Sequence, residues 1–150
     1  MGEQSFSDFC SSLGCPLNNS RWSWCAISKD AQRAVFTIWG DEMSRIEGTR
    51  NRRYVLAATT ERRPGEIPPE SNELLGAREM NRIAVYCADN PNVECLGILC
   101  TAMDVTAIPR QRKAFDRLSV FRMRVVREGE NIVAELYERV PIHSVMRRSR

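Results

Sequence analysis

The hydrophobic and polar positions of this chain alternate mostly with the two-residue period of β-strands. Residues 33–39, RAVFTIW, carry apolar side chains on both faces of an extended segment, which predicts a central strand covered on both sides. A short apolar run at 24–27 precedes it, and the polar cluster at 28–32 between the two predicts a β-hairpin. The stretch 21–42, which holds all three tryptophans, is therefore expected to organise the rest of the fold.

Further periodic segments predict two helices and four more strands. Apolar residues at spacings of three and four predict a helix over 70–89, and a serine-capped amphipathic segment predicts a short one over 5–13. Strands are expected at 54–58, 95–101, 118–126 and 132–140, with loops at 44–53, 61–69 and 104–114. Gly97 is expected to allow the close approach of another backbone.

These elements indicate an α+β fold, formed by a curved, mainly antiparallel sheet or a small β-barrel with two flanking helices. A single domain is expected over residues 1–150, with a basic tail from about residue 143 that frays. No internal repeat or low-complexity segment divides the chain.

Composition narrows the class of protein. An apolar content of 43% and a charged content of 27% are typical of a globular domain, and no apolar run is long enough to span a membrane. The N-terminus lacks the pattern of a signal peptide, so a cytoplasmic protein with reduced cysteines is expected. There is no CxxC pair and His143 is the single histidine, so no metal site and no cofactor is predicted. No known catalytic motif is present, which favours a binding module over an enzyme.

Positive charge is concentrated in one part of the sequence. Twenty arginines outnumber two lysines, and seven basic residues lie between positions 106 and 127 against Asp116 alone. Clustered arginine is typical of proteins that contact phosphates and guanine edges. Two simpler explanations of the arginine content remain open. The arginines could lie on a solvated strand face, or they could reflect the codon bias of a GC-rich genome. The residues expected to contact nucleic acid are Arg110, Arg112, Lys113, Arg117, Arg122 and Arg124.

The three tryptophans support two interpretations. Aromatic side chains dominate small cores, so Trp22, Trp24 and Trp39 are expected in the first place to be buried. The alternative is a pocket for a flat group, with Trp22 as its exposed stacking surface. Asp41 and its neighbour Glu42 are expected to pair with nearby arginines. Loop carboxylates of this kind can also hold magnesium in a nuclease, although no spacing of a known site is present.

The same residues carry a resemblance to a known family. The matching positions are Trp22-Ser23-Trp24, Ala26, Val35, Ile38-Trp39, Asp41-Glu42, Gly76, Arg78-Glu79, Gly97, Asp104, Pro109-Arg110 and Phe115-Asp116. This pattern resembles the N-terminal domain that is fused to HNH nuclease modules in modification-dependent, type IV-like restriction endonucleases, and it extends over residues 5–142. The chain departs from the family by lacking the HNH module, because one histidine cannot build that metal site.

The resemblance implies a PUA- or SRA-like reader of double-stranded DNA that senses a modified or flipped base or a modified backbone. Such a domain would be the recognition module of a restriction or defence system, beside a nuclease module or subunit. A base would stack on the tryptophans, and the pocket residues would be Trp22, Trp24, Trp39, Asp41, Asp104 and Asp116, with Arg78 joining the DNA contacts. The alternatives are a protein-interaction module with a basic surface, and a small carboxylate-dependent nuclease or hydrolase.

Overall fold

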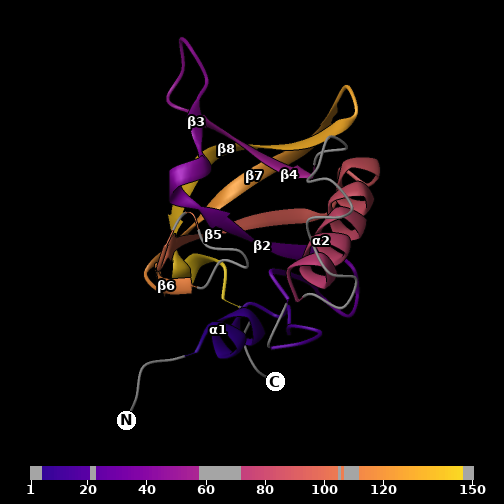
Figure 1. Ribbon diagram of the computed structural model, residues 1–150, viewed down its shortest axis with the longest axis vertical. Helices are drawn as coiled ribbons and strands as arrows, with labels where there is room; N and C mark the ends of the chain where they lie inside the picture. The colour runs from indigo at the N-terminus through magenta and orange to yellow at the C-terminus, as the bar shows by residue number, and fades with distance from the viewer. Residues whose placement is uncertain (1–4, 21–22, 58–71, 105, 107–111, 147–150) are drawn as a thin grey trace.

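The computed structural model describes residues 5–20, 23–57, 72–104, 106 and 112–146. Two helices flank one sheet of eight strands (Figure 1). The helices are α1 (Phe6–Ser12) and α2 (Asn72–Asp89), and the short 3-10 turns are η1 (Gly40–Glu42) and η2 (Ile142–Ser144). The strands are β1 (Cys25–Ile27), β2 (Arg33–Trp39), β3 (Ser44–Arg45), β4 (Arg52–Ala57), β5 (Glu94–Ala102), β6 (Arg112–Phe115), β7 (Ser119–Glu128) and β8 (Asn131–Pro141).

The sheet is mixed but mostly antiparallel, with the strand order β1-β2-β5-β7-β8-β4-β3. Among the described strands β2 and β5 run parallel, and every other pair is antiparallel. Strands β7 and β6 pair with successive parts of the same edge of β5, separated by the bend at 116–118. Of the two predicted forms, the structure has the open curved sheet, because the two ends of the strand order do not pair into a barrel.

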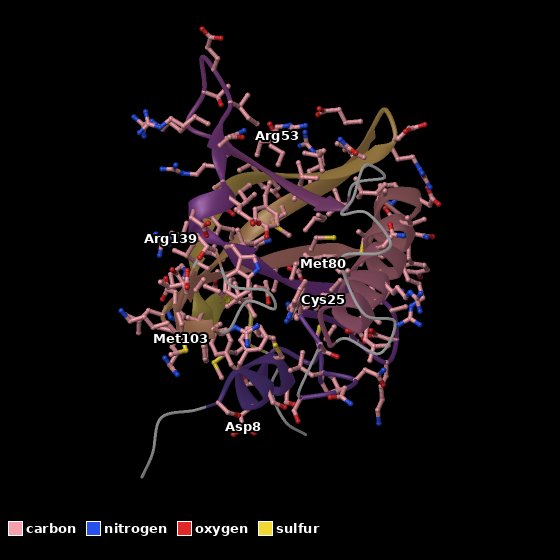
Figure 2. The ribbon with its side chains drawn as sticks, in the orientation of Figure 1. Asp8, Cys25, Arg53, Met80, Met103 and Arg139 are labelled. Atoms are coloured by element: carbon pink, nitrogen blue, oxygen red, sulfur yellow. The ribbon has the colours of Figure 1, made fainter. Side chains whose placement is uncertain are left out.

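Both helices pack against the sheet, and the expected central strand, β2, lies inside the sheet between β1 and β5. All seven side chains of β2 are buried, which confirms the strand covered on both sides. Helix α2 contacts β1 and β2 near one end of the strand order and β4 near the other, which requires a strongly curved sheet. Cys25 of β1 and Met80 of α2 lie in the interior between these elements (Figure 2).

Gly97 of β5 allows a close approach, although the group that approaches differs from the expectation. A Cβ atom at this position would lie 2.8 Å from Cγ1 of Ile38 and 2.8 Å from Sδ of Met123. These are side chains of the two neighbouring strands, not the backbone of another segment. The glycine therefore makes room for core packing within the sheet.

A buried arginine joins the two ends of the described chain to the sheet. Arg33, at the start of β2, forms an ion pair with Glu94 at 2.6 Å between Nε and Oε1. Its Nη1 group donates to the carbonyl of Leu13 at 3.0 Å and to that of Val145 at 2.5 Å. Val145 is only 3% exposed, so the C-terminal segment is packed as far as this residue and the predicted fraying from about residue 143 is wrong there.

The segment 44–53, expected to be a loop, is instead a β-hairpin. Strand β4 begins at Arg52, two residues before the predicted start, and pairs with β3 through Ser44↔Arg53 and Arg45↔Arg52. The backbone N–H of Ile46 donates to the carbonyl of Asn51 at 3.1 Å and closes the turn. This hairpin projects from the body of the sheet at the top of Figure 1.

Candidate nucleic-acid interface

The basic residues predicted to contact DNA lie in separate parts of the structure. Arg110 lies outside the described residues. Lys113 is exposed on β6, and Arg78 is exposed on α2. Arg117 lies in the bend after β6, where its guanidinium carbon is 4.0 Å from the centre of the Phe115 ring and Nη1 donates to the Phe115 carbonyl at 3.3 Å. Nearness in sequence therefore does not give these cations one common surface.

Arg112 points inward, which corrects its expected place on the surface. Its guanidinium carbon lies 3.5 Å from the centre of the Phe6 ring of α1 and 5.9 Å from the Trp39 ring. Its Nη2 group donates to Oγ1 of Thr37 at 3.1 Å. Stacking on aromatic faces is a favourable environment for a guanidinium group, so Arg112 holds α1 against the sheet.

Arg122 and Arg124 project from one face of β7, as predicted, but both already have acidic partners. Arg122 lies 3.2 Å from Glu138 and 3.8 Å from Glu94, and Arg124 lies 3.5 Å from Glu135. The carboxylates come from β5 and β8, the neighbouring strands. A phosphate that approached these arginines would have to compete with them, which weakens the predicted track along β7.

The aromatic and acidic residues of the predicted pocket differ in how deeply they are buried. Trp22 lies outside the described residues. Trp39 is 5% exposed and belongs to the core, as the first of the two interpretations expects, and Trp24 is half-buried against the same core. Asp41 is exposed in η1.

Asp104 and Asp116 are held by separate local hydrogen bonds. Asp104 is exposed and accepts from the N–H and hydroxyl of Thr106, which lowers its pKa. Partial burial opposes ionisation of Asp116, but hydrogen bonds from Leu118, Arg139 and Ser119 outweigh that cost and lower its pKa. Among the residues that the structure describes, no three His, Cys, Asp or Glu side chains lie close enough together to hold a metal ion.

The hairpin of β3 and β4 is a basic surface that the sequence interpretation did not select. We call residues 44–53 the arginine hairpin, because they contain Arg45, Arg50, Arg52 and Arg53 against Glu47 alone. Arg53 forms an ion pair with Glu128 at the tip of the β7–β8 hairpin, and the Asn51 amide donates to Glu135 at 3.3 Å. Figure 2 shows Arg53 near the base of the hairpin. These contacts hold the hairpin to the sheet while its tip remains exposed.

Two arginines of this hairpin lie directly opposite each other. Arg45 and Arg52 are cross-strand partners, so their side chains share one face, with Cβ atoms about 5 Å apart as is usual for such pairs. Within the described ranges, Arg45, Arg50 and Arg52 have no ion-pair partner. Like charges at opposite positions destabilise a strand pair. The repulsion between Arg45 and Arg52 therefore destabilises the fold locally, and a bound anion would relieve it.

The fold and this surface define the class of the protein as an α+β domain with an open, curved sheet and a projecting arginine hairpin. Its described helices include none with the length and apolar character needed to cross a membrane. A scan against protein-family models, a search of curated proteins and a search of solved structures each gave no match for the chain.

Proposed function

We propose that this protein is a DNA-binding module, and that the arginine hairpin is the element that contacts the duplex. The observation that carries the proposal is the cross-strand pair of Arg45 and Arg52, which have no acidic partner in the described part of the chain. Other described arginines of the sheet, such as Arg122 and Arg139, are paired with carboxylates. The hairpin therefore brings together several arginines that are available to an external anion.

The shape of the hairpin fits the same partner. The major groove of B-form DNA is about 12 Å wide and admits a two-stranded β-ribbon. Arg50 lies in the turn of the hairpin, where it would reach base edges, while Arg45 and Arg52 would lie nearer the phosphates. Arginine suits both contacts, because its planar guanidinium group binds phosphate and guanine in a bidentate manner.

The finer part of the proposal is that the bound DNA is modified. It is supported by the pattern shared with the N-terminal domains of modification-dependent restriction endonucleases, which includes Trp24, Trp39 and Asp41. On this proposal the open sheet is PUA- or SRA-like, and the protein is the recognition module of a defence system whose nuclease is a separate module or subunit. The mark is a modified base or a modified backbone.

Fluorescence anisotropy with labelled duplexes of one sequence tests both parts. Plain, cytosine-modified and phosphorothioate DNA are compared at several salt concentrations. The double variant Arg45→Ala/Arg52→Ala should lose affinity and reduce the dependence of log K on log salt by about two units, one for each lost phosphate contact. The matched control Arg127→Ala/Arg139→Ala removes the same charge from arginines paired with Asp89 and Asp116, and should change the slope much less.

The outcomes separate the proposal from its alternatives. Equal loss in the two double variants would show that net charge, not the arginine hairpin, drives binding. Tighter binding to one modified duplex would identify the modification that is recognised. Equal binding to all three duplexes would refute the proposal that the protein recognises modified DNA. No binding at low salt would overturn the DNA proposal and favour an acidic protein partner. Metal-dependent cleavage of the duplex would instead identify a nuclease.

A further inference from the structure

A cavity of about 500 Å³ opens where strand β5 begins. Strand β7 continues beyond its last partner on β5, so residues 124–128 have no strand of the described sheet on that side. The cavity lies between this edge, the last turn of α2 and the connection at 91–93. Its rim includes Arg124 and Tyr137, whose ring centre is 5.8 Å from the Arg124 guanidinium carbon.

Two cysteines from different elements border this cavity. Cys87 comes from the last turn of α2 and Cys95 from the second residue of β5, and each thiol shifts the pKa of the other. Each is buried, at 2% and 6% exposure, but the cavity connects them to solvent. The Cys95 thiol also lies 3.6 Å from the carbonyl of Val93, which helps to fix its direction.

We propose that Cys87 and Cys95 are a site of reversible oxidative modification, at which a hydroperoxide converts the two thiols into a disulfide. The Cys87 thiolate attacks one oxygen of the hydroperoxide, the O–O bond breaks, and Cys87 becomes a sulfenic acid while the other oxygen leaves as water or an alcohol. The Cys95 sulfur then attacks the Cys87 sulfur, the S–O bond breaks, and water is released. The two thiols lose two hydrogens in total, and the hydroperoxide is reduced by two electrons.

The environment of each thiol assigns the two roles. The contact with the Cys95 side chain lowers the pKa of Cys87, although burial opposes this, and the same contact together with burial raises the pKa of Cys95. Cys87 is thus the thiol that ionises and reacts first, and Cys95 is the one that resolves the sulfenic acid.

The remaining described cysteines lack these features. Cys10, Cys15, Cys25 and Cys100 are buried and do not border the cavity. Burial raises the pKa of Cys10 to about 12 and also raises those of Cys25 and Cys100. A low thiolate fraction makes a thiol slow to react with peroxide, so the modification should be selective for the pair at the cavity.

The disulfide would join the end of α2 to the start of β5. Closing this short loop covalently restricts the unfolded chain, and it should raise the midpoint of thermal unfolding by about 5–10 °C if the native geometry accepts the bond. Treatment with a dithiol reductant should restore the original midpoint.

The test is brief exposure of the native protein to hydrogen peroxide, followed by unfolding in excess maleimide and mass spectrometry. We expect two fewer maleimide adducts than in the untreated protein, and a non-reducing peptide map that joins the peptides of Cys87 and Cys95. The variant Cys87→Ser should abolish the cross-link, whereas the matched buried variant Cys15→Ser should retain it. The peptide map of the unmutated protein decides the matter even if a variant fails to fold.

Three results would overturn the proposal. One is a full set of maleimide adducts after exposure to peroxide at concentrations that oxidise free cysteine. Another is a cross-link between other cysteines. The third is oxidation of Cys87 to the sulfinic acid without a cross-link, which would show that the Cys95 thiol does not reach it.

Discussion

Replacing Arg33 by methionine should be one of the most damaging single changes of a charged residue in this fold. The side chain of Arg33 is 9% exposed, and it binds Glu94, the Leu13 carbonyl and the Val145 carbonyl. Methionine keeps most of the volume of the side chain but none of its donors. Removing one partner of a buried ion pair costs about 3–5 kcal/mol, because the remaining groups stay buried without compensation.

The lower end of this range is expected for Arg33→Met. Glu94 is 35% exposed and lies 3.8 Å from Arg122, so its carboxylate keeps some solvent and a second cation. The Leu13 carbonyl keeps only a long contact with the Cys15 thiol, at 3.9 Å, and the Val145 carbonyl has no other donor among the described residues. Each unsatisfied buried acceptor costs about 1–3 kcal/mol. We therefore expect a loss of about 3 kcal/mol in the free energy of unfolding.

Urea denaturation followed by tryptophan fluorescence measures this loss, and Arg53→Met is the matched control. Arg53 also forms an ion pair, with Glu128, but its side chain is 33% exposed, so its removal should cost only about 0.2–1 kcal/mol. Hydrogen exchange should also show that Arg33→Met releases α1 and the segment around Val145 before the rest of the sheet. A difference of less than about 1 kcal/mol between the two variants would refute the role of Arg33 as a buried tie.

Three further changes test other parts of the structure. Gly97→Ala should destabilise the protein by about 1–3 kcal/mol, because the added Cβ atom would lie 2.8 Å from Sδ of Met123. Unchanged stability in urea would show that the neighbouring side chains move to make room for it. Burial raises the pKa of Glu79 in the folded state. The contribution of this carboxyl group to stability is therefore fully present below its unfolded pKa of about 4.3, and it is lost as the pH rises through the folded pKa. Glu79→Gln should therefore gain stability relative to the unmutated protein between acidic and neutral pH, and a constant difference across urea titrations would contradict this. Arg45→Thr should raise stability by about 0.2–1 kcal/mol by relieving repulsion with Arg52, yet weaken DNA binding; a loss of stability would show that the pair is not strained.

The elements with a clear hydrophobic period could be predicted from the sequence. Both faces of strand β2 are largely apolar, so the strand is buried on both sides, and this pattern is visible without any tertiary information. Helix α2, from residue 72 to 89, matches the predicted stripe closely. The turn between β7 and β8 also follows local chemistry, since Gly129 adopts a positive φ of 62°.

Pairings between distant segments could not be predicted in this way. The parallel pairing of β2 with β5 joins residues about sixty positions apart, and their hydrophobic patterns alone do not distinguish a parallel from an antiparallel neighbour. The 44–53 hairpin was missed because β3 is two residues long, too short to show a period. A signal was present nevertheless: four arginines lie within nine residues, a higher local density than in the stretch from 106 to 127.

The tertiary structure also determines whether an arginine has an ion-pair partner. It thereby decides which basic segment is available for binding. The stretch from 106 to 127 has the larger charge in the sequence, but β7 lies between β5 and β8, which bring Glu94, Glu135 and Glu138 to its arginines. The arginine hairpin lies at the outer end of the strand order, where β3 has no second neighbour among the described strands. At this edge position Arg45 has no ion-pair partner among the described residues, and on the proposed function the same face is open to a large partner such as a duplex. On the proposed function, the position of a basic segment within the sheet is therefore a better guide to the DNA contact surface than its charge.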